Sequence, residues 1–304
     1  MDILDKLIEW AQIRGRVDIH CRFQGKWFVR HETRKKQALV HIVTSGSGWL
    51  KVDGEPQARQ LKAGDVLFFP RLAAHTLSSE TSCDNTQDTP LSTQQGAFTL
   101  KHIGNEQADL TLFCARFEYN KHADLLTGLP ETVCLSMQQT VLEPLVQMLQ
   151  NEAEQGGQGS ASVIDALSNV LLVSMMRAYL SQPETEQNLN GVLQGLQDKR
   201  LRGLIQVVLD APEQPWAVEE MVALANVSRA QLMRLFKQHV GMSPHAFVNH
   251  IRVQKAAMLL RKTQDSILKI ALDSGFQSET HFGKIFKKQY EMTPGQYRKQ
   301  ENAA

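Results

Sequence analysis

The sequence has little cysteine, no long apolar run and no targeting signal. Its 304 residues hold four cysteines, Cys21, Cys83, Cys114 and Cys134, and none belongs to a Cys-x-x-Cys pair. This spacing gives no zinc-ribbon signal, and in a reducing compartment it favours free thiols. No apolar run reaches the ~18 residues that span a bilayer. The start, MDILDKLIEWAQ, lacks the basic residues and apolar core of a signal peptide, so we expect a cytoplasmic protein.

A strong net charge is also missing, but the formal sum of +1 hides an asymmetry. Residues 199–300 hold 16 Lys and Arg against 8 Asp and Glu, whereas residues 1–198 hold 17 against 23. A basic segment attached to an acidic remainder indicates a module that binds a polyanion. The alternative is that the excess of positive charge consists only of solvated surface lysines and binds no polyanion. At roughly 150 residues per domain, the length favours two domains.

Short β-prone runs broken by turn signals fill residues 17–118. Gly46-Ser47-Gly48 and Asp53-Gly54 are such turn signals, and many short strands at this spacing predict a sandwich or barrel. Helical periodicity begins near residue 125. Residues 160–180 have the spacing of a long apolar-rich helix, which we expect to pack on the barrel or on a second copy of the chain.

A self-match at an offset of fifty residues marks the C-terminal part. SRAQLMRLFKQHVGMSPHAF, from Ser228, aligns with SETHFGKIFKKQYEMTPGQY, from Ser278. Each copy predicts a helix with a serine N-cap and one apolar face, and each follows a shorter helix and a tight turn. The pattern predicts two helix-turn-helix units, held by one helix over residues 246–261.

Two rigidly joined helices of this kind can enter successive major grooves of double-stranded DNA. Arg234 and Gln231 have the chemistry to read guanine and adenine edges, while lysines and Arg298 would contact phosphates. A basic scaffold without sequence preference is the alternative. The candidate DNA-contacting residues are Arg229, Ala230, Gln231, Met233, Arg234, Lys237, Glu279, Thr280, His281, Lys284, Lys287, Lys288 and Arg298.

The last hundred residues resemble the DNA-binding domain of AraC/XylS-family transcription regulators. The resemblance rests on Ser-x-x-x-Leu-x-Arg-x-Phe-Lys at Ser228–Lys237, Gly241-Met-Ser-Pro244, Gly275-Phe276 and Thr293-Pro-Gly-Gln-Tyr297. It implies promoter DNA and RNA polymerase as partners. It also implies that bases are read by Ala230, Met233 and Arg234 in the first unit and by Glu279, Thr280 and Lys284 in the second.

In the N-terminal half, RQLKAGDVLFFPRLAAH at Arg59–His75 resembles the second cupin motif. The sequence does not match the first cupin motif, because it has no His-x-His pair with a following glutamate. An enzymatic cupin needs three or four convergent metal ligands. That set is not evident, so we expect no enzyme and keep a cupin metalloenzyme as a weaker alternative.

Four residues of this half, Cys21, His41, His75 and Cys114, could converge inside the barrel. Thiolate and imidazole suit Zn²⁺ or Cu⁺. The thiols could instead be oxidised by an electrophile such as hypochlorite, or all four residues could simply lie in the core. No cofactor is certain from the sequence.

The whole chain resembles MtrA-type activators of multidrug efflux-pump operons, at MDILDKL, VHIVTSGSGWL, LPETV and QDKRL. More distantly it resembles reactive-chlorine-responsive regulators. We predict an α+β protein of two domains: a cupin-like β-barrel with a helical dimerisation segment (1–180), a linker (181–197), and an all-α double helix-turn-helix domain (198–304). The predicted function is a homodimeric, DNA-binding transcription activator that responds to a small molecule, a metal or an oxidant.

Overall fold

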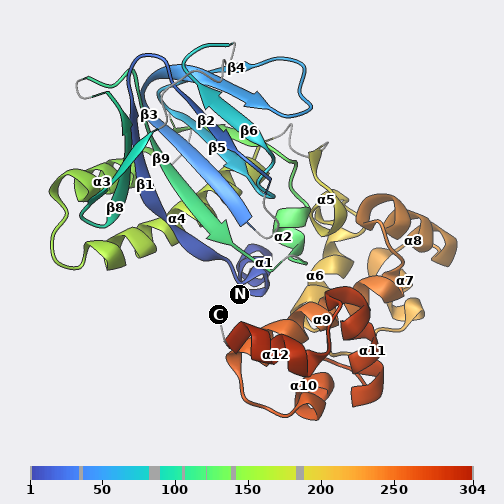
Figure 1. The fold of residues 1–304 in the computed structure, drawn as a ribbon. Helices are drawn as coiled ribbons and strands as arrows, with labels where there is room; N and C mark the ends of the chain where they lie inside the picture. Colours follow the sequence, from blue (N-terminus) through green and yellow to red (C-terminus); the bar gives the residue numbers. More distant parts are fainter. Residues whose placement is uncertain are drawn as a thin grey trace. The chain divides into compact units, whose positions relative to one another are not determined.

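The computed structural model describes residues 2–33, 37–81, 90–104, 107–120, 122–137, 142–182 and 188–302. The chain forms two compact units (Figure 1). The sheet unit comprises residues 14–119 and 130–185, and the helical unit comprises residues 1–13, 120–129 and 186–304. In this division residues 1–13 and 120–129 group with the C-terminal helices, and the domain boundaries given above stay a prediction.

Ten strands of the described residues build the sheet unit. They are β1 (Arg14–Phe23), β2 (Phe28–His31), β3 (Gln37–Val52), β4 (Arg59–Lys62), β5 (Asp65–Phe69), β6 (His75–Ser78), β7 (Leu91–Gln95), β8 (Phe98–Ile103), β9 (Leu110–Glu118) and β10 (Val133–Ser136). The main order is β10-β5-β3-β9-β1-β8-β7, while β4 and β6 also pair with β3, and β2 pairs with β6. The predicted cupin-like sheet is confirmed.

Strand β3 connects the two halves of this sheet. Its residues 37–46 pair with β9, and its residues 47–52 pair with β4 and β6. The change of partner falls at Gly46, whose φ is 78° and whose position leaves only 1.8 Å between a built Cβ and the Asp109 carbonyl oxygen. Only glycine fits this conformation and this approach, so the predicted Gly46-Ser47-Gly48 turn is instead a bend inside one long strand.

Alternate side chains of these strands contribute to a hydrophobic core, which includes Ile19, Cys21 and Phe23 of β1. The buried positions of β1 have the period of two that is typical of a strand. The helices α3 (Leu142–Gln155) and α4 (Ser160–Leu180) belong to the same unit, and α4 contacts β1 and β10. The Ser168 hydroxyl of α4 accepts a hydrogen bond from the Val17 backbone N–H at 2.9 Å.

Helix α4 is, among the described residues, the one helix long and apolar enough to cross a membrane by length and composition. The sequence reading did not predict such a run. Half of its apolar stretch is buried within the protein. Ser168 and Ser174 of α4 are among the buried residues.

The helical unit contains the remaining helices. They are α1 (Ile3–Ala11), α2 (Asp124–Thr127), α5 (Gly191–Gln197), α6 (Arg202–Asp210), α7 (Val218–Ala225), α8 (Arg229–Leu235), the π-helical turn η3 (Phe236–Val240), α9 (Pro244–Lys262), α10 (Ile267–Asp273), α11 (Glu279–Tyr290) and α12 (Pro294–Asn302). Serine N-caps begin several of them: Ser228 accepts from the Gln231 N–H at 3.2 Å, and Ser278 accepts from the His281 N–H at 3.3 Å. Both are the serines that the repeat aligns.

Two separate cores lie in this unit, one for each copy of the repeat. Leu232, Leu235 and Phe236 belong to the first core, and Phe282 and Phe286 belong to the second. Helix α9 contributes to both, because its first half supplies Phe247, Val248 and Ile251 to one core, and its second half supplies Val253, Ala256, Ala257 and Leu260 to the other. A continuous helix shared by two cores fixes the two copies relative to each other.

Candidate nucleic-acid interface and histidine cluster

Each copy of the repeat folds as helix, tight turn, helix. Between α7 and α8 the chain turns through Asn226, with φ at 50°, and between α10 and α11 it turns through Gly275, with φ at 91°. Both residues adopt the left-handed conformation that asparagine and glycine tolerate best. The second helices differ, since α11 is regular to Tyr290 whereas α8 passes into the π-helical turn η3 at Phe236.

One face of each second helix is exposed and polar. On α8 and η3, Arg229, Ala230, Met233, Arg234 and Lys237 are exposed and Gln231 is half-buried. On α11 the exposed residues are Glu279, Thr280, His281, Lys284, Lys287 and Lys288. The opposite faces are the buried ones that form the two cores. This arrangement leaves a polar ridge on each unit, shaped to enter a major groove.

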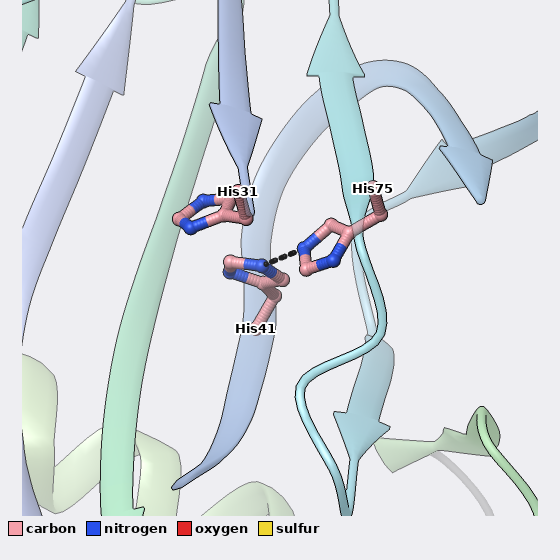
Figure 2. A group of neighbouring side chains, drawn as sticks. All are labelled: His31, His41 and His75. Carbon is pink, nitrogen blue, oxygen red and sulfur yellow. Dashed lines mark hydrogen bonds between the residues drawn. The ribbon is translucent and has the colours of Figure 1, made fainter. Parts of the chain in front are cut away.

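In the sheet unit, three histidines from three strands come together (Figure 2). His31 ends β2, His41 lies in β3 and His75 begins β6. Strand pairing accounts for the meeting, because His31 is the direct cross-strand partner of His75 and His41 is the direct partner of Cys114 in β9. One ring nitrogen from each histidine lies within 4.8 Å of the other two.

A chain of hydrogen bonds runs through this cluster. His75 Nδ1 lies 2.7 Å from the Ala73 carbonyl oxygen, which can only accept, so His75 carries its proton on Nδ1. The unprotonated His75 Nε2 then accepts from His41 Nε2 at 2.9 Å (Figure 2). His41 Nδ1, left with its lone pair, accepts from the Cys114 thiol at 3.1 Å. Each hydrogen-bond donor in this series therefore has one acceptor.

Burial keeps these imidazoles neutral. His41 and His75 are both fully buried. Burial, together with the charge that His31 and His75 would carry, lowers the pKa of His41 well below its ordinary value. Burial also lowers the pKa of His75 to about 4, against the opposing hydrogen bond to Ala73. The neutral ring is the form that ligates a metal.

The two predicted cysteines lie beside the histidines, outside the three-histidine group. Cys21 and Cys114 are buried, and their sulfur atoms are 3.9 Å apart. The hydrogen bond shared with Cys21 and the burial raise the pKa of Cys114 well above its ordinary value, so Cys114 is a thiol at neutral pH. A buried protonated thiol reacts slowly with electrophiles.

Comparison with known proteins agrees with both units. The Cupin family model matches residues 2–181, and the Helix-turn-helix domain model matches residues 221–300. The chain is 55% identical over 300 residues to the HTH-type transcriptional regulator MtrA of Neisseria gonorrhoeae, covering 99% of each chain. It belongs to the AraC-type transcriptional regulators with an N-terminal cupin domain.

Two more distant similarities accompany these matches. The regulator is 26% identical to the RCS-specific HTH-type transcriptional activator RclR of Escherichia coli, over 98% of this chain and 97% of that one. A solved AraC-type DNA-binding domain from Chromobacterium violaceum is 32% identical, covering 34% of this chain and 91% of that chain with a TM-score of 0.33. The expectation that the chain is not an enzyme agrees with relatives that are named as transcriptional regulators.

Within the regulator, Arg298 makes internal hydrogen bonds that the sequence did not predict. It is half-buried, and its guanidinium donates to the Leu260 carbonyl at 3.3 Å and to the Asp265 carbonyl at 2.6 Å. These carbonyls lie at and beyond the end of α9, where free backbone acceptors need partners. The Arg298 guanidinium therefore caps the end of α9, and a phosphate contact by Arg298 stays a prediction.

His31 is the residue of the cluster that sequence reasoning missed. It lies 44 residues before His75, and no spacing in the sequence indicates that β2 and β6 pair. The sequence lacks the His-x-His pair of the first cupin motif. The regulator instead supplies His31 and His41 from two separate strands, one at the end of β2 and one within β3.

Proposed function

We propose that the regulator recognises promoter DNA in a sequence-specific way by placing α8 and α11 in successive major grooves on one side of the duplex. One observation carries the proposal: both helices present exposed polar faces, and both are fixed to the same helix, α9. Successive major grooves are one helical turn apart, about 34 Å along the DNA. A rigid link holds the two helices at one fixed spacing, as simultaneous binding to two grooves requires.

The chemistry of the exposed residues divides them into two kinds of contact. Arg234 and Lys284 occupy equivalent positions of the two copies and can donate to guanine acceptors in the groove. Gln231 can pair with adenine, and the exposed Met233 side chain can contact a thymine methyl. Lys237, Lys287 and Lys288 lie toward the ends of the same helices and would contact phosphates, which makes affinity depend on salt.

The proposal predicts that Arg234→Ala and Lys284→Ala each weaken operator binding by about 1–3 kcal/mol, or roughly 5- to 150-fold in Kd. Footprinting and titration on promoter DNA at fixed salt measure the change. Lys269→Ala is the matched control, because Lys269 is exposed on α10 and already pairs with Asp265 and Asp273. Operator binding by both variants at the wild-type level would contradict the assignment of these helices.

We further propose that the cupin domain receives the signal and that the regulator activates transcription with RNA polymerase in the cytoplasm. An effector can act only if it binds two states of the protein with different affinities. A cavity of about 240 Å³ in the sheet unit, lined by His31, Cys114, Arg30, Lys101 and Arg116 among others, offers space for one. Resemblance to MtrA-type regulators supports a multidrug efflux operon as the target.

Mapping the bound sites across the genome tests this regulatory part of the proposal. The map should be made with and without oxidant, copper and detergent-like compounds, and combined with transcript levels. Enrichment at an efflux promoter, with higher transcription under one of these agents, is the expected result. The proposal would be contradicted if transcription from the bound promoters stayed the same with any of these agents and in the absence of the regulator.

A second copy of the chain is the proposed partner of the α3–α4 layer. Val163 and Val170 are exposed on α4 and, seven residues apart, lie on one face of that helix. Met148 of α3 is also exposed. These apolar side chains would be buried if two copies paired through this face. Sedimentation velocity of the wild type and of Val170→Asp measures the oligomeric state.

Oxidation of thiols is the second candidate input, favoured by the 3.9 Å between the sulfur atoms of Cys21 and Cys114. Hypochlorous acid would take two electrons from the two thiols, giving one disulfide, chloride, water and a proton. Cys21→Ser and Cys114→Ser should then each abolish an oxidant-dependent transcriptional response, measured with a promoter reporter. Cys134→Ser is the control. An unchanged response in both variants would reject the thiol hypothesis.

A further inference from the structure

The three-histidine cluster has features that a hydrophobic core does not require. Each imidazole comes from a different strand, and the rings pack with centroids 4.8–5.2 Å apart. Phe69 stacks on His75 at 3.9 Å between ring centroids, which fixes the plane of that ring. His41 and His75 have hydrogen-bond partners within the protein, so no missing partner is at issue. The convergence of ring nitrogens from three strands on one point is what indicates a binding site.

Two of the nitrogen atoms already face each other. His41 Nε2 and His75 Nε2 are 2.9 Å apart and share one proton. Tetrahedral Zn²⁺ with Zn–N bonds of 2.0–2.1 Å places its nitrogen ligands about 3.3 Å apart. The observed separations, from 2.9 Å up to 4.8 Å, bracket that value.

We propose that His31, His41 and His75 form a binding site for a single Zn²⁺ ion, with the fourth coordination position open to the adjacent cavity. His31 and Cys114 both line that cavity, so an ion or an exogenous ligand can reach the site from it. Neutral imidazole suits Zn²⁺, whereas Mg²⁺ and Ca²⁺ require oxygen ligands.

The surrounding groups orient the ligands. A metal-ligating histidine characteristically donates its other ring N–H to a carbonyl, carboxylate or water. His75 does this already, through Nδ1 and the Ala73 carbonyl. When Zn²⁺ takes His41 Nε2, the proton of that atom moves to Nδ1, which then donates to Cys114 Sγ at 3.1 Å. The Cys114 S–H turns to Cys21 Sγ, 3.9 Å away, so no proton is lost.

The site differs from the predicted set of Cys21, His41, His75 and Cys114. In the proposal the sulfur atoms orient His41, and His31 is the third ligand. An open fourth position on a protein with no catalytic role is a place for an exogenous ligand to bind the metal. That Zn²⁺ occupancy regulates DNA binding rests on the proposed function, whereas the metal site itself does not.

Zinc titration of the full-length protein, stripped of metal with a chelator, tests the proposal. Competition against a chromophoric chelator should show one Zn²⁺ per chain, and Co²⁺ in its place should show the absorption of a tetrahedral site. His31→Gln and His75→Gln should each weaken binding by more than the 10–100-fold that loss of an outer-shell partner costs. His31 is half-exposed at a strand end, so its variant should fold even if the His75 variant does not.

His102→Gln is the matched control, since His102 lies half-buried on β8 outside the cluster. It should bind Zn²⁺ like wild type. No stoichiometric Zn²⁺ binding by wild type, or equal binding by a folded His31→Gln, would overturn the site. Footprinting with and without Zn²⁺ separates the two proposals. If Arg234→Ala loses operator binding but still binds Zn²⁺, both assignments are supported. If wild type binds Zn²⁺ without any change in operator affinity, only the regulatory role of the metal is rejected.

Discussion

At the scale of single residues, the second helix-turn-helix unit depends on one glycine. Gly275 has φ at 91°, and a Cβ built on it would lie 2.6 Å from Glu213 Cα and 2.8 Å from Arg252 Nε. Arg252 in turn donates to the carbonyls of Pro212 and Gln214, so it is not free to move away. The turn therefore needs glycine for both its conformation and its space.

Gly275→Ala should destabilise the helical unit by at least about 1 kcal/mol, because strain at positive φ and a backbone clash add. Gly283→Ala is the matched control in the same unit. Gly283 lies within α11 and a built Cβ meets nothing within 4 Å, so alanine there should stabilise by up to about 1 kcal/mol. Urea denaturation followed by circular dichroism measures both, and equal effects would contradict this account.

At the scale of elements, a buried ion pair joins α2 to α9. His250 Nε2 lies 2.9 Å from Asp124 Oδ1, and Gln254 Nε2 donates to Asp124 Oδ2 at 2.5 Å. Burial disfavours the charged ring, but the Asp124 carboxylate and a hydrogen bond with Gln289 outweigh it and raise the pKa of His250 above its ordinary value. The short helix α2 is therefore held to the helix that connects the two reading units.

The sign of the pH dependence follows from this shift. Because the pKa of His250 is higher in the folded than in the unfolded state, the pair contributes its full stability below about pH 6.5. That contribution is lost as pH rises through the raised value. Asp124→Asn should remove this pH dependence and lower the stability at pH 6 by about 3 kcal/mol.

Thermal or urea unfolding between pH 5.5 and 8.5 measures the effect. Asp273→Asn is the control, because Asp273 forms an exposed ion pair with Lys269 that is worth less than about 1 kcal/mol. A stability of Asp124→Asn that falls with pH as steeply as wild type would show that the pair does not carry the dependence.

At the scale of the whole molecule, the chain passes between its two units more than once. Residues 1–13 and 120–129 fold with the C-terminal helices although they precede or interrupt the sheet in the sequence. Trp10 of α1 is buried in the core of the first helix-turn-helix unit, and Lys262 of α9 pairs with Glu9 at 2.5 Å. Asn120 Nδ2 donates to the Tyr290 hydroxyl of α11 at 2.7 Å.

The segment 120–129 follows β9 directly and precedes β10 in the sequence. Within the helical unit it contacts α11 through Asn120 and α9 through Asp124. A fragment starting at residue 198 would lack Trp10 and Val192 from the first core and Asp124 from the ion pair with His250. The predicted linker at 181–197 is also not all extended, since α5 occupies residues 191–197 and Val192 is buried.

The sequence by itself determined the two helix-turn-helix units, their serine caps and their exposed faces. These features depend on spacings of three to eight residues within one segment, where a helix relates neighbours directly. It also predicted that Cys21, His41, His75 and Cys114 could converge inside the barrel.

Tertiary structure alone decided that His31 joins His41 and His75, that Arg298 caps α9, and that α1 and α2 pack with the C-terminal helices. Each of these facts depends on which distant segments pair and in what register. Strand register and helix docking are set by the packing of the complete core, so no local pattern of residues records them.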